Sequence, residues 1–207
     1  MPEAHMVATL FHARSGNSFR AAIGTELSPK PIARQLLDLT QGDHKSAEHL
    51  VRNPVGAVPV YVEDDKVLTQ SGAILMLMVR RWQPDLIPAD AWQCSQVEAS
   101  FLAAVGDIAA QNAHMRYMDF DERNVEFLSE RLLNSIRAAF INVGSQRYLF
   151  GDELSVADLA HYPVIHMRRA LLEQAGDFQA VLDWADKVCL FPAVVRAIDY
   201  AALELPA

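Results

Sequence analysis

Residues 42–74 read GDHKSAEHLVRNPVGAVPVYVEDDKVLTQSGAI and contain the clearest structural signals of the chain. Ala57–Val62 is a β-prone run interrupted by Pro59. Because proline cannot donate to a strand ladder, this residue predicts a sheet edge or a special turn. The acidic pair at 64–65 predicts a hairpin turn into a second short strand. Ser71 then stands where a serine caps a helix, before apolar residues at helical spacing.

The residues before this segment predict further alternation of strands and helices. Met6–His12 is a short apolar run typical of a buried strand, and Ser18–Leu27 predicts a helix. Ile32–Leu39 predicts a second strand, and Ala47–Arg52 a short helix. Together with the hairpin and the helix after it, the order is β-α-β-α-β-β-α. This order predicts a thioredoxin-like α/β domain over residues 1–82.

The pattern changes after residue 82. Residues 83–90 (QPDLIPAD) hold two prolines without periodicity and predict a linker, and residues 91–207 carry apolar stripes at helical spacing. Ser155 and Asp158 form a capping-box signature at the start of one of these helices, so we expect Asp158 to serve folding and not chemistry. The fold class predicted is a thioredoxin-like N-terminal domain followed by an all-α C-terminal domain.

Composition excludes several classes of function. The 207 residues carry a formal net charge of −8, which argues against a nucleic acid or an anionic membrane as the main partner. The N-terminus has no signal-peptide pattern and no stretch is apolar for the length of a membrane span, so we expect a cytoplasmic protein. Cys94 and Cys189 have neither metal-ligand nor CxxC spacing, so no metal site is expected.

Four segments together resemble the cytosolic glutathione S-transferases, in the order of that family and across nearly the whole chain. The resemblance implies a homodimer that uses glutathione as cosubstrate and a small hydrophobic electrophile or a disulfide as second substrate. The segments are SGNSFRAAI (15–23), the stretch 42–74 quoted above, LIPAD (86–90), and YLFGDELSVADLAHYPVI (148–165) with FPAVVRAI (191–198).

By this resemblance, two pairs of residues bind the peptide part of glutathione. The bond between Val58 and Pro59 is cis in the family, and the backbone of the residue in the place of Val58 pairs with the cysteinyl backbone of glutathione. Gln70 and Ser71 precede the third helix, whose N-terminus suits the γ-glutamyl carboxylate. An ordinary edge-strand proline and an ordinary N-cap serine are the alternative interpretations.

The glycyl carboxylate of glutathione is bound in some family members by a basic pair, which here is His44 and Lys45. A solvated loop is the alternative interpretation of these two residues. The family often has a lysine or arginine just before the valine and proline, and this chain has Ala57 there. The departure removes one cation from the expected site.

The turn after the first strand supplies the group that activates the glutathione thiol in this family. Ser15 resembles the catalytic serine of the serine-type classes, whereas Asn17 stands where other classes have cysteine or asparagine. Ser18 is expected to be a helix cap. Because the turn has no cysteine, it cannot itself form a mixed disulfide with glutathione. His114, Arg116 and Tyr117 fall where the family lines its electrophile pocket.

The reaction expected is addition of the glutathione thiolate to a small electrophile, or thiol–disulfide exchange or peroxide reduction. The run RSGNSFR also resembles the maleylacetoacetate isomerase (zeta) class, so a glutathione-dependent cis–trans isomerase is a second hypothesis. Asn17 replaces the cysteine of that class. A non-catalytic scaffold or regulatory protein of the same fold is the third hypothesis, because Ala57 and the RSGNS turn depart from the common pattern.

Overall fold

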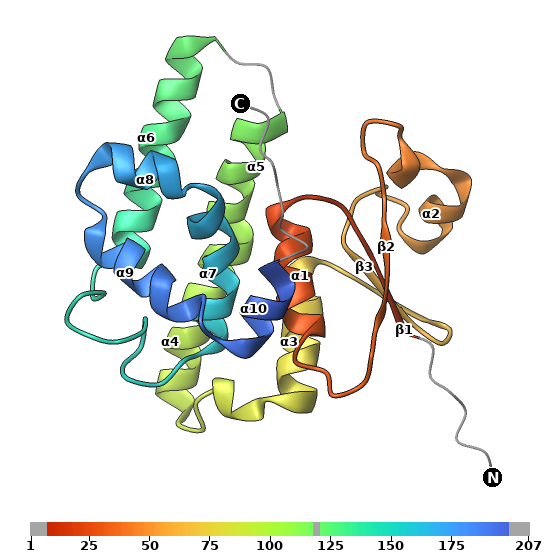
Figure 1. The fold of residues 1–207 in the computed structure, drawn as a ribbon, viewed down its shortest axis with the longest axis horizontal. Coiled ribbons are helices and arrows are strands. Elements are labelled where there is room, and N and C mark those ends of the chain that lie inside the picture. Colours follow the sequence, from red (N-terminus) through yellow and green to blue (C-terminus); the bar gives the residue numbers. More distant parts are fainter. Residues whose placement is uncertain (1–7, 118–120, 199–207) are drawn as a thin grey trace. The chain divides into compact units, whose positions relative to one another are not determined.

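The computed structural model describes residues 8–117 and 121–198, and the chain divides into two compact units (Figure 1). The first unit takes the described residues up to Gln83 together with helix α10 (Pro192–Ile198). The second unit takes the described residues from Pro84 to Phe191. The mixed sheet of the first unit and the helices of the second confirm the predicted fold class.

The first unit is built on a four-stranded sheet with strand order β2-β1-β3-β4. Its strands are β1 (Ala8–His12), β2 (Ala33–Leu36), β3 (Val60–Glu63) and β4 (Lys66–Thr69). β1 and β2 are parallel, and the other two pairs are antiparallel. Adjacent residues of a strand point to opposite faces, yet Leu10 and Phe11 are both buried. Both faces of β1 are therefore covered within the fold.

Helices of the first unit cover both sides of this sheet. They are α1 (Gly16–Thr25), η1 (Asp43–Lys45), α2 (Ala47–Arg52), α3 (Ser71–Trp82) and α10. Figure 1 shows α1 and α3 on one side of the sheet and α2 on the other. α1 and α3 approach closely at Gly24, where an added Cβ would lie 2.9 Å from the Cα of Leu75. The element order is the predicted thioredoxin-like one.

Two helix starts differ from the sequence prediction. α1 begins at Gly16 because Ser15 is its N-cap and its side chain accepts the Ser18 N–H, so the expected cap at Ser18 is wrong. α3 begins at Ser71 with Gln70 in the N-cap position and no side-chain cap bond, so Ser71 is not the cap. β2 and β3 are also shorter than the expected strands. Some residues of the predicted strands 32–39 and 57–62 lie outside the part of each strand that pairs with a neighbour.

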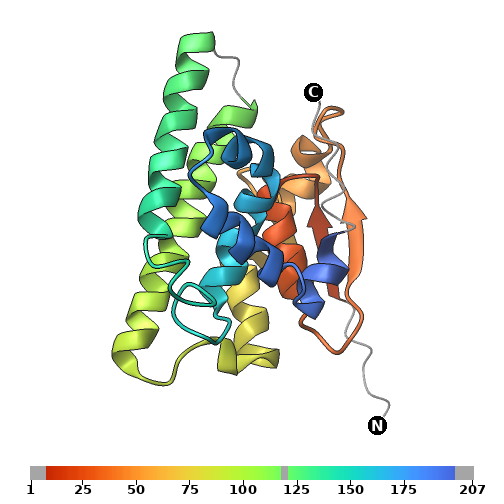
Figure 2. The ribbon, with the colours of Figure 1, turned by 60° about the vertical axis from the view of Figure 1, so that its left-hand side comes forward.

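The second unit consists of helices. They are η2 (Pro84–Leu86), α4 (Ala91–Leu102), η3 (Ala103–Ile108), α5 (Ala109–Tyr117), α6 (Glu122–Ala139), α7 (Val156–Met167), α8 (Arg169–Ala175) and α9 (Gln179–Val188). The segment η3 is a π-helix that connects α4 directly to α5. Figure 2 shows α6 alongside this continuous run.

The start of α7 is fixed by a buried carboxylate. Asp158 accepts hydrogen bonds from the Ser155 N–H at 2.9 Å and the Ser155 hydroxyl at 2.6 Å, and the predicted capping box is confirmed. It also accepts from the Leu149 N–H at 3.0 Å and from Nε1 of Trp184 at 2.8 Å. One side chain thereby joins the start of α7 to the preceding loop and to α9.

Helix α10 follows the helices of the second unit in sequence but packs with the first. The expected boundary at residue 91 placed it with the later helices, whereas contacts group it with α1. Arg196 donates to the Glu26 carboxylate at 2.9 Å and to the Glu26 carbonyl at 2.7 Å. Glu26 also pairs with Arg34 of β2. These charged contacts, at the end of α1, could not be anticipated from local pattern.

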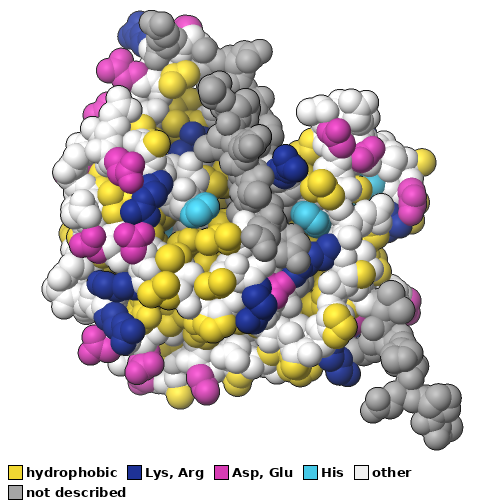
Figure 3. Space-filling view, viewed as in Figure 1, with side chains coloured by type: hydrophobic (Ala, Val, Ile, Leu, Met, Phe, Trp, Pro, Cys, Tyr) yellow, Lys and Arg dark blue, Asp and Glu magenta, His cyan; other side chains and the backbone are white. Residues whose placement is uncertain are grey.

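The surface of the second unit mixes the two signs of charge. Arg137 pairs with Asp177, and Arg169 pairs with Glu173 and Asp186. Figure 3 shows acidic and basic side chains interspersed on the face it presents. Within the described residues, no helix combines the length and apolarity needed to cross a membrane. No group of three potential metal ligands is found in that part of the chain either.

Candidate functional site

The pairing of the strands brings the predicted site segments to one edge of the sheet. Val60 pairs with Phe11 on one side and with Thr69 on the other, and His12 pairs with Leu36. The carboxyl ends of β1, β2 and β4 therefore meet the amino end of β3. The turn into α1, the loop toward η1, the Val58-Pro59 bond and the start of α3 all begin at this edge.

The turn into α1 is held by its own hydroxyls. The Ser15 Oγ accepts the Ser18 N–H at 3.2 Å and donates to the Ser18 Oγ at 3.1 Å. The Ser18 Oγ also accepts the Ala13 N–H at 3.1 Å. Ser15 is half-buried and Ser18 is buried. The Ser15 hydroxyl thus serves the N-terminus of α1, next to the position where a ligand would meet the helix.

A buried arginine connects this turn to the start of α3. Arg20 lies on α1 and is 0% exposed, and its Nη1 donates to the Asn17 Oδ1 at 2.8 Å and to the Ser71 Oγ at 3.1 Å. The Ser71 hydroxyl donates to the same Asn17 oxygen at 3.4 Å. Burial lowers the pKa of Arg20 to about 10, so the guanidinium remains charged at neutral pH. Two predicted site residues, Asn17 and Ser71, are therefore in direct contact.

Gln70 holds a backbone conformation that few side chains adopt. Its φ is 73° and its ψ is 119°, immediately before the first residue of α3. Such a conformation costs about 1–3 kcal/mol for a residue other than glycine and is concentrated at functional sites. It turns the chain sharply from β4 into the helix. Ser71 consequently enters α3 at its first turn, where the backbone N–H groups have no intrahelical acceptor.

The backbone before β3 is available to a ligand. The Val58-Pro59 bond is cis, as the resemblance implied. The Val58 side chain packs against the cluster that contains Phe11 and Val60. Within the described residues, no hydrogen bond reaches the Val58 N–H or C=O. The side chain is thus anchored while both backbone groups remain open.

Helix α2 fixes the residue that precedes Val58. The Asn53 Nδ2 donates to the Ala57 carbonyl at 2.8 Å, and the His49 Nε2 lies 3.1 Å from the same oxygen. Both side chains are buried; His49 lies on α2 and Asn53 is the residue that ends it. Neither residue was among the predicted site residues, although Asn53 begins the NPVG run of the segment that resembles the family.

The basic pair lies in η1, before α2. The Lys45 Nζ donates to the Val55 carbonyl at 3.0 Å, and both Lys45 and its loop are at the surface. Gly56 has a φ of +63°, and an added Cβ there would lie 2.8 Å from the Lys45 Nζ and 2.9 Å from the His44 carbonyl oxygen. Glycine at this position therefore lets the ammonium group lie against the loop that leads to Val58.

Comparison with known proteins identifies the family of the chain. The family model described as "Glutathione S-transferase, N-terminal domain" matches residues 6–78, and "Glutathione S-transferase, C-terminal domain" matches residues 98–192. Glutathione S-transferase 1 of Zea mays is 32% identical over 162 residues, which cover 72% of this chain and 75% of the maize protein. The chain belongs to the glutathione S-transferase family.

A second plant relative and a solved structure are similar to this family member. Probable glutathione S-transferase GSTF2 of Oryza sativa subsp. japonica is 34% identical over 139 residues, but the match spans only 63% of the rice protein and 60% of this chain. The crystal structure of glutathione transferase F7 from Populus trichocarpa has a TM-score of 0.81 at 21% identity, and the match covers 95% of this chain and 100% of that one. This structural likeness shows the fold.

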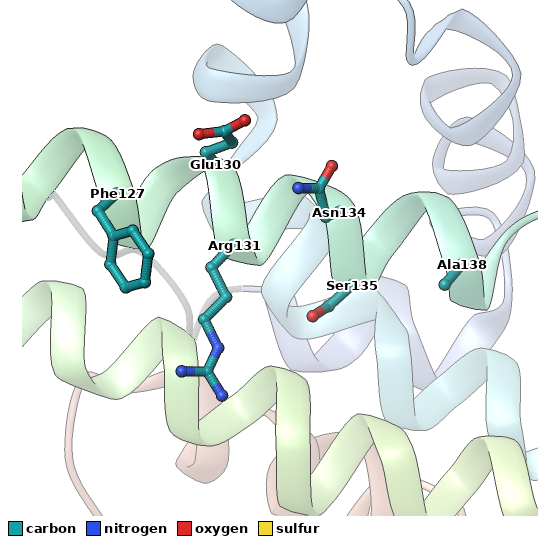
Figure 4. Close-up of a pocket in the computed structure, with 6 residues that line it drawn as sticks. All are labelled: Phe127, Glu130, Arg131, Asn134, Ser135 and Ala138. Atoms are coloured by element: carbon teal, nitrogen blue, oxygen red, sulfur yellow. The ribbon is translucent and has the colours of Figure 1, made fainter.

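The residues expected to line the electrophile pocket lie on α5, in the second unit. His114 is exposed on this helix, and the side chains of Arg116 and Tyr117 lie outside the described residues. A separate open hollow of about 550 Å³ runs along α6 (Figure 4). It is lined by Phe127, Glu130, Arg131, Asn134, Ser135 and Ala138. Ser135 in this hollow is already bonded to Gln111 of α5.

Proposed function

We propose that this family member binds glutathione at the edge of the sheet and activates its thiol for transfer to a small electrophile. The contact between Asn17 and Ser71, bridged by Arg20, carries this proposal. It joins the N-termini of two helices, and a helix N-terminus favours negative charge. Two negatively charged groups of glutathione are proposed to lie there, the γ-glutamyl carboxylate and the thiolate.

Each part of glutathione has a proposed partner in the first unit. The γ-glutamyl carboxylate binds the Ser71 hydroxyl and the backbone around Gln70 at the start of α3. The cysteinyl backbone pairs with the open N–H and C=O of Val58, next to Pro59, in the manner of an added strand. The glycyl carboxylate lies toward the basic pair formed by His44 and Lys45. Since Ala57 supplies no cation, we expect this last contact to be the weakest.

The thiol is proposed to lie at the turn into α1, where Ser15 and Asn17 are the candidate donors. A free thiol has a pKa of about 8.5, so only a small fraction is thiolate at neutral pH. A hydrogen bond to the charged form lowers that pKa. The proton leaves to solvent, the sulfur forms a thioether bond with an electrophilic carbon, and the displaced group leaves with the bonding electron pair. His114, on α5 of the second unit, stays a candidate for contact with the second substrate.

The test of glutathione binding is a titration of the Ser71→Ala variant. The change removes a hydroxyl that bonds a carboxylate, worth about 1.5–3 kcal/mol, so we expect affinity to fall roughly 10- to 100-fold by calorimetry. Ser28→Ala is the matched control, because the Ser28 hydroxyl bonds only within its own loop. Equal affinities of Ser71→Ala and wild type would contradict the carboxylate assignment. A wild type that binds no glutathione would favour the scaffold hypothesis.

We also propose that the protein is a symmetric homodimer. Large apolar side chains are exposed on the edge strand β4 and on α4 and α6. They are Val67, Trp92, Leu102, Val125 and Phe127. Light scattering at micromolar concentration is expected to give twice the 23.0 kDa of one chain. A wild-type particle with the mass of a single chain would contradict the dimer. In that case the Phe127→Asp variant should have the same measured mass as the wild type.

A further inference from the structure

Arg20 is placed where a charge must be stabilised by neighbours. It belongs to α1 and is 0% exposed, and its pKa of about 10 leaves it protonated at neutral pH. The same nitrogen, Nη1, bonds oxygens on two different elements, Asn17 at the start of α1 and Ser71 at the start of α3. A buried arginine is rare unless it is paired, so these polar contacts restrict where the guanidinium can lie.

The chemistry of the arginine determines which way the Asn17 amide faces. A guanidinium has five N–H donors and no acceptor, so the group facing it must be an oxygen. The Asn17 Oδ1 takes this place at 2.8 Å and also accepts the Ser71 hydroxyl at 3.4 Å. The two N–H donors of the amide must then point the other way. Within the described residues, no hydrogen bond from the Asn17 Nδ2 is found.

Ser15, the other candidate donor, directs its hydroxyl into the turn. Its Oγ donates to the Ser18 Oγ at 3.1 Å while accepting the Ser18 N–H. Asn17 differs, because its acceptor oxygen is occupied and its donors are not. The two side chains are both half-buried and lie two residues apart. Of the two candidate side chains, Asn17 is therefore the one whose donor groups are available.

We propose that Arg20 is a positioning residue that acts through Asn17. By holding the amide oxygen, it aims the Asn17 N–H donors at the sulfur of bound glutathione. The bond to Ser71 lets the same guanidinium align the γ-glutamyl contact with the thiol contact. This inference rests on the proposed glutathione binding and deepens it, since it assigns the orientation of the thiol donor to a residue that does not touch the sulfur.

The experiment is a double-mutant cycle of Arg20→Lys and Asn17→Ala. Arg20→Lys retains the positive charge but loses the planar donor group, so a change cannot be ascribed to a lost charge. The readout is the ultraviolet thiolate absorbance of bound glutathione against pH, with the S-methylglutathione complex subtracted as the blank. Arg34→Lys, at a partly buried arginine that pairs with Glu26, is the matched control.

We expect Arg20→Lys to raise the pKa of the bound thiol by about one unit, a tenfold lower thiolate fraction at pH 6.5. Asn17→Ala should raise it by about one to two units, and the double variant should equal Asn17→Ala. A shift by Arg20→Lys that persists fully in the Asn17→Ala background would overturn the proposal. So would an unchanged thiol pKa in Arg20→Lys, whereas Arg34→Lys should leave the titration as in wild type.

A second variant applies if Arg20→Lys does not fold. Asn17→Asp keeps an oxygen for Arg20 and for Ser71 but has no N–H donor, so the bound thiol pKa should rise at least as far as in Asn17→Ala. A wild-type pKa in Asn17→Asp would contradict the role of the amide donors and hence of Arg20. Absence of glutathione binding in the wild type would instead overturn the proposed function. If the wild type binds glutathione but Arg20→Lys leaves the pKa of the bound thiol unchanged, only this inference would be overturned.

Discussion

Replacing Asp158 by alanine is expected to lower the free energy of unfolding by about 3–5 kcal/mol, since each buried donor left without an acceptor costs about 1–3 kcal/mol. The carboxylate is 0% exposed and accepts from the backbone of Leu149 and Ser155 and from the Trp184 indole. Desolvation raises the pKa of Asp158, and these hydrogen bonds oppose that rise. Thermal and urea unfolding monitored by circular dichroism would measure the loss.

Two further variants make the Asp158 experiment specific. Asp158→Asn keeps one acceptor oxygen in the same place, so its loss should lie between those of wild type and Asp158→Ala. Asp183→Ala is the control, because Asp183 is exposed on α9 and bonds only Gln179, and surface changes of this kind usually stay within about 0.5 kcal/mol. Normal stability of Asp158→Ala together with abolished turnover would show that the residue acts in chemistry.

Gly24→Ala is expected to lower the free energy of unfolding by about 1–3 kcal/mol, the range typical of overpacking in a close-packed core. The added Cβ would meet the Leu75 Cα at 2.9 Å, and a backbone atom cannot rotate away as a flexible side chain can. α1 must then move from α3. Because Arg20 bridges the same two helices, glutathione affinity should fall as well, which calorimetry would measure alongside unfolding.

Gly106→Ala provides the same chemical change in an open position. Apart from the adjoining backbone of its own helix and its chain neighbours, no atom lies within 4 Å of the Cβ that it would add. Alanine is favoured over glycine inside a helix by roughly 0.5–1 kcal/mol, so this variant should be neutral or stabilised. Equal losses for Gly24→Ala and Gly106→Ala would mean that the close approach of α1 to α3 does not limit stability.

Signals that lie within a few residues of one another could be predicted from the sequence. The short helix Ala47–Arg52 was placed with its observed bounds, and the capping box of Ser155 and Asp158 was recognised. Both depend on local hydrogen bonds and spacing. The α1 cap was misplaced because two serines, at positions 15 and 18, each precede helical residues, and only the backbone conformation distinguishes them.

Features that depend on distant partners could not be predicted. Arg20 was not among the predicted site residues, because its partner Ser71 lies 51 positions further along the chain. The positive φ of Gln70 could not be predicted from its residue type. The candidates for thiol activation, Ser15 and Asn17, could be named from the sequence. The contact that joins Asn17 and Arg20 to Ser71 could not, because it forms only when α1 and α3 are packed together.

The return of α10 to the first unit has a consequence for how the chain is made. A ribosome releases the strands, α1 and α3 long before it adds residues 192–198. Until then, α1 lacks its contacts with α10, and Glu26 lacks the Arg196 partner. The first unit therefore emerges before the second but can be completed only after it, because α10 follows every described helix of the second unit.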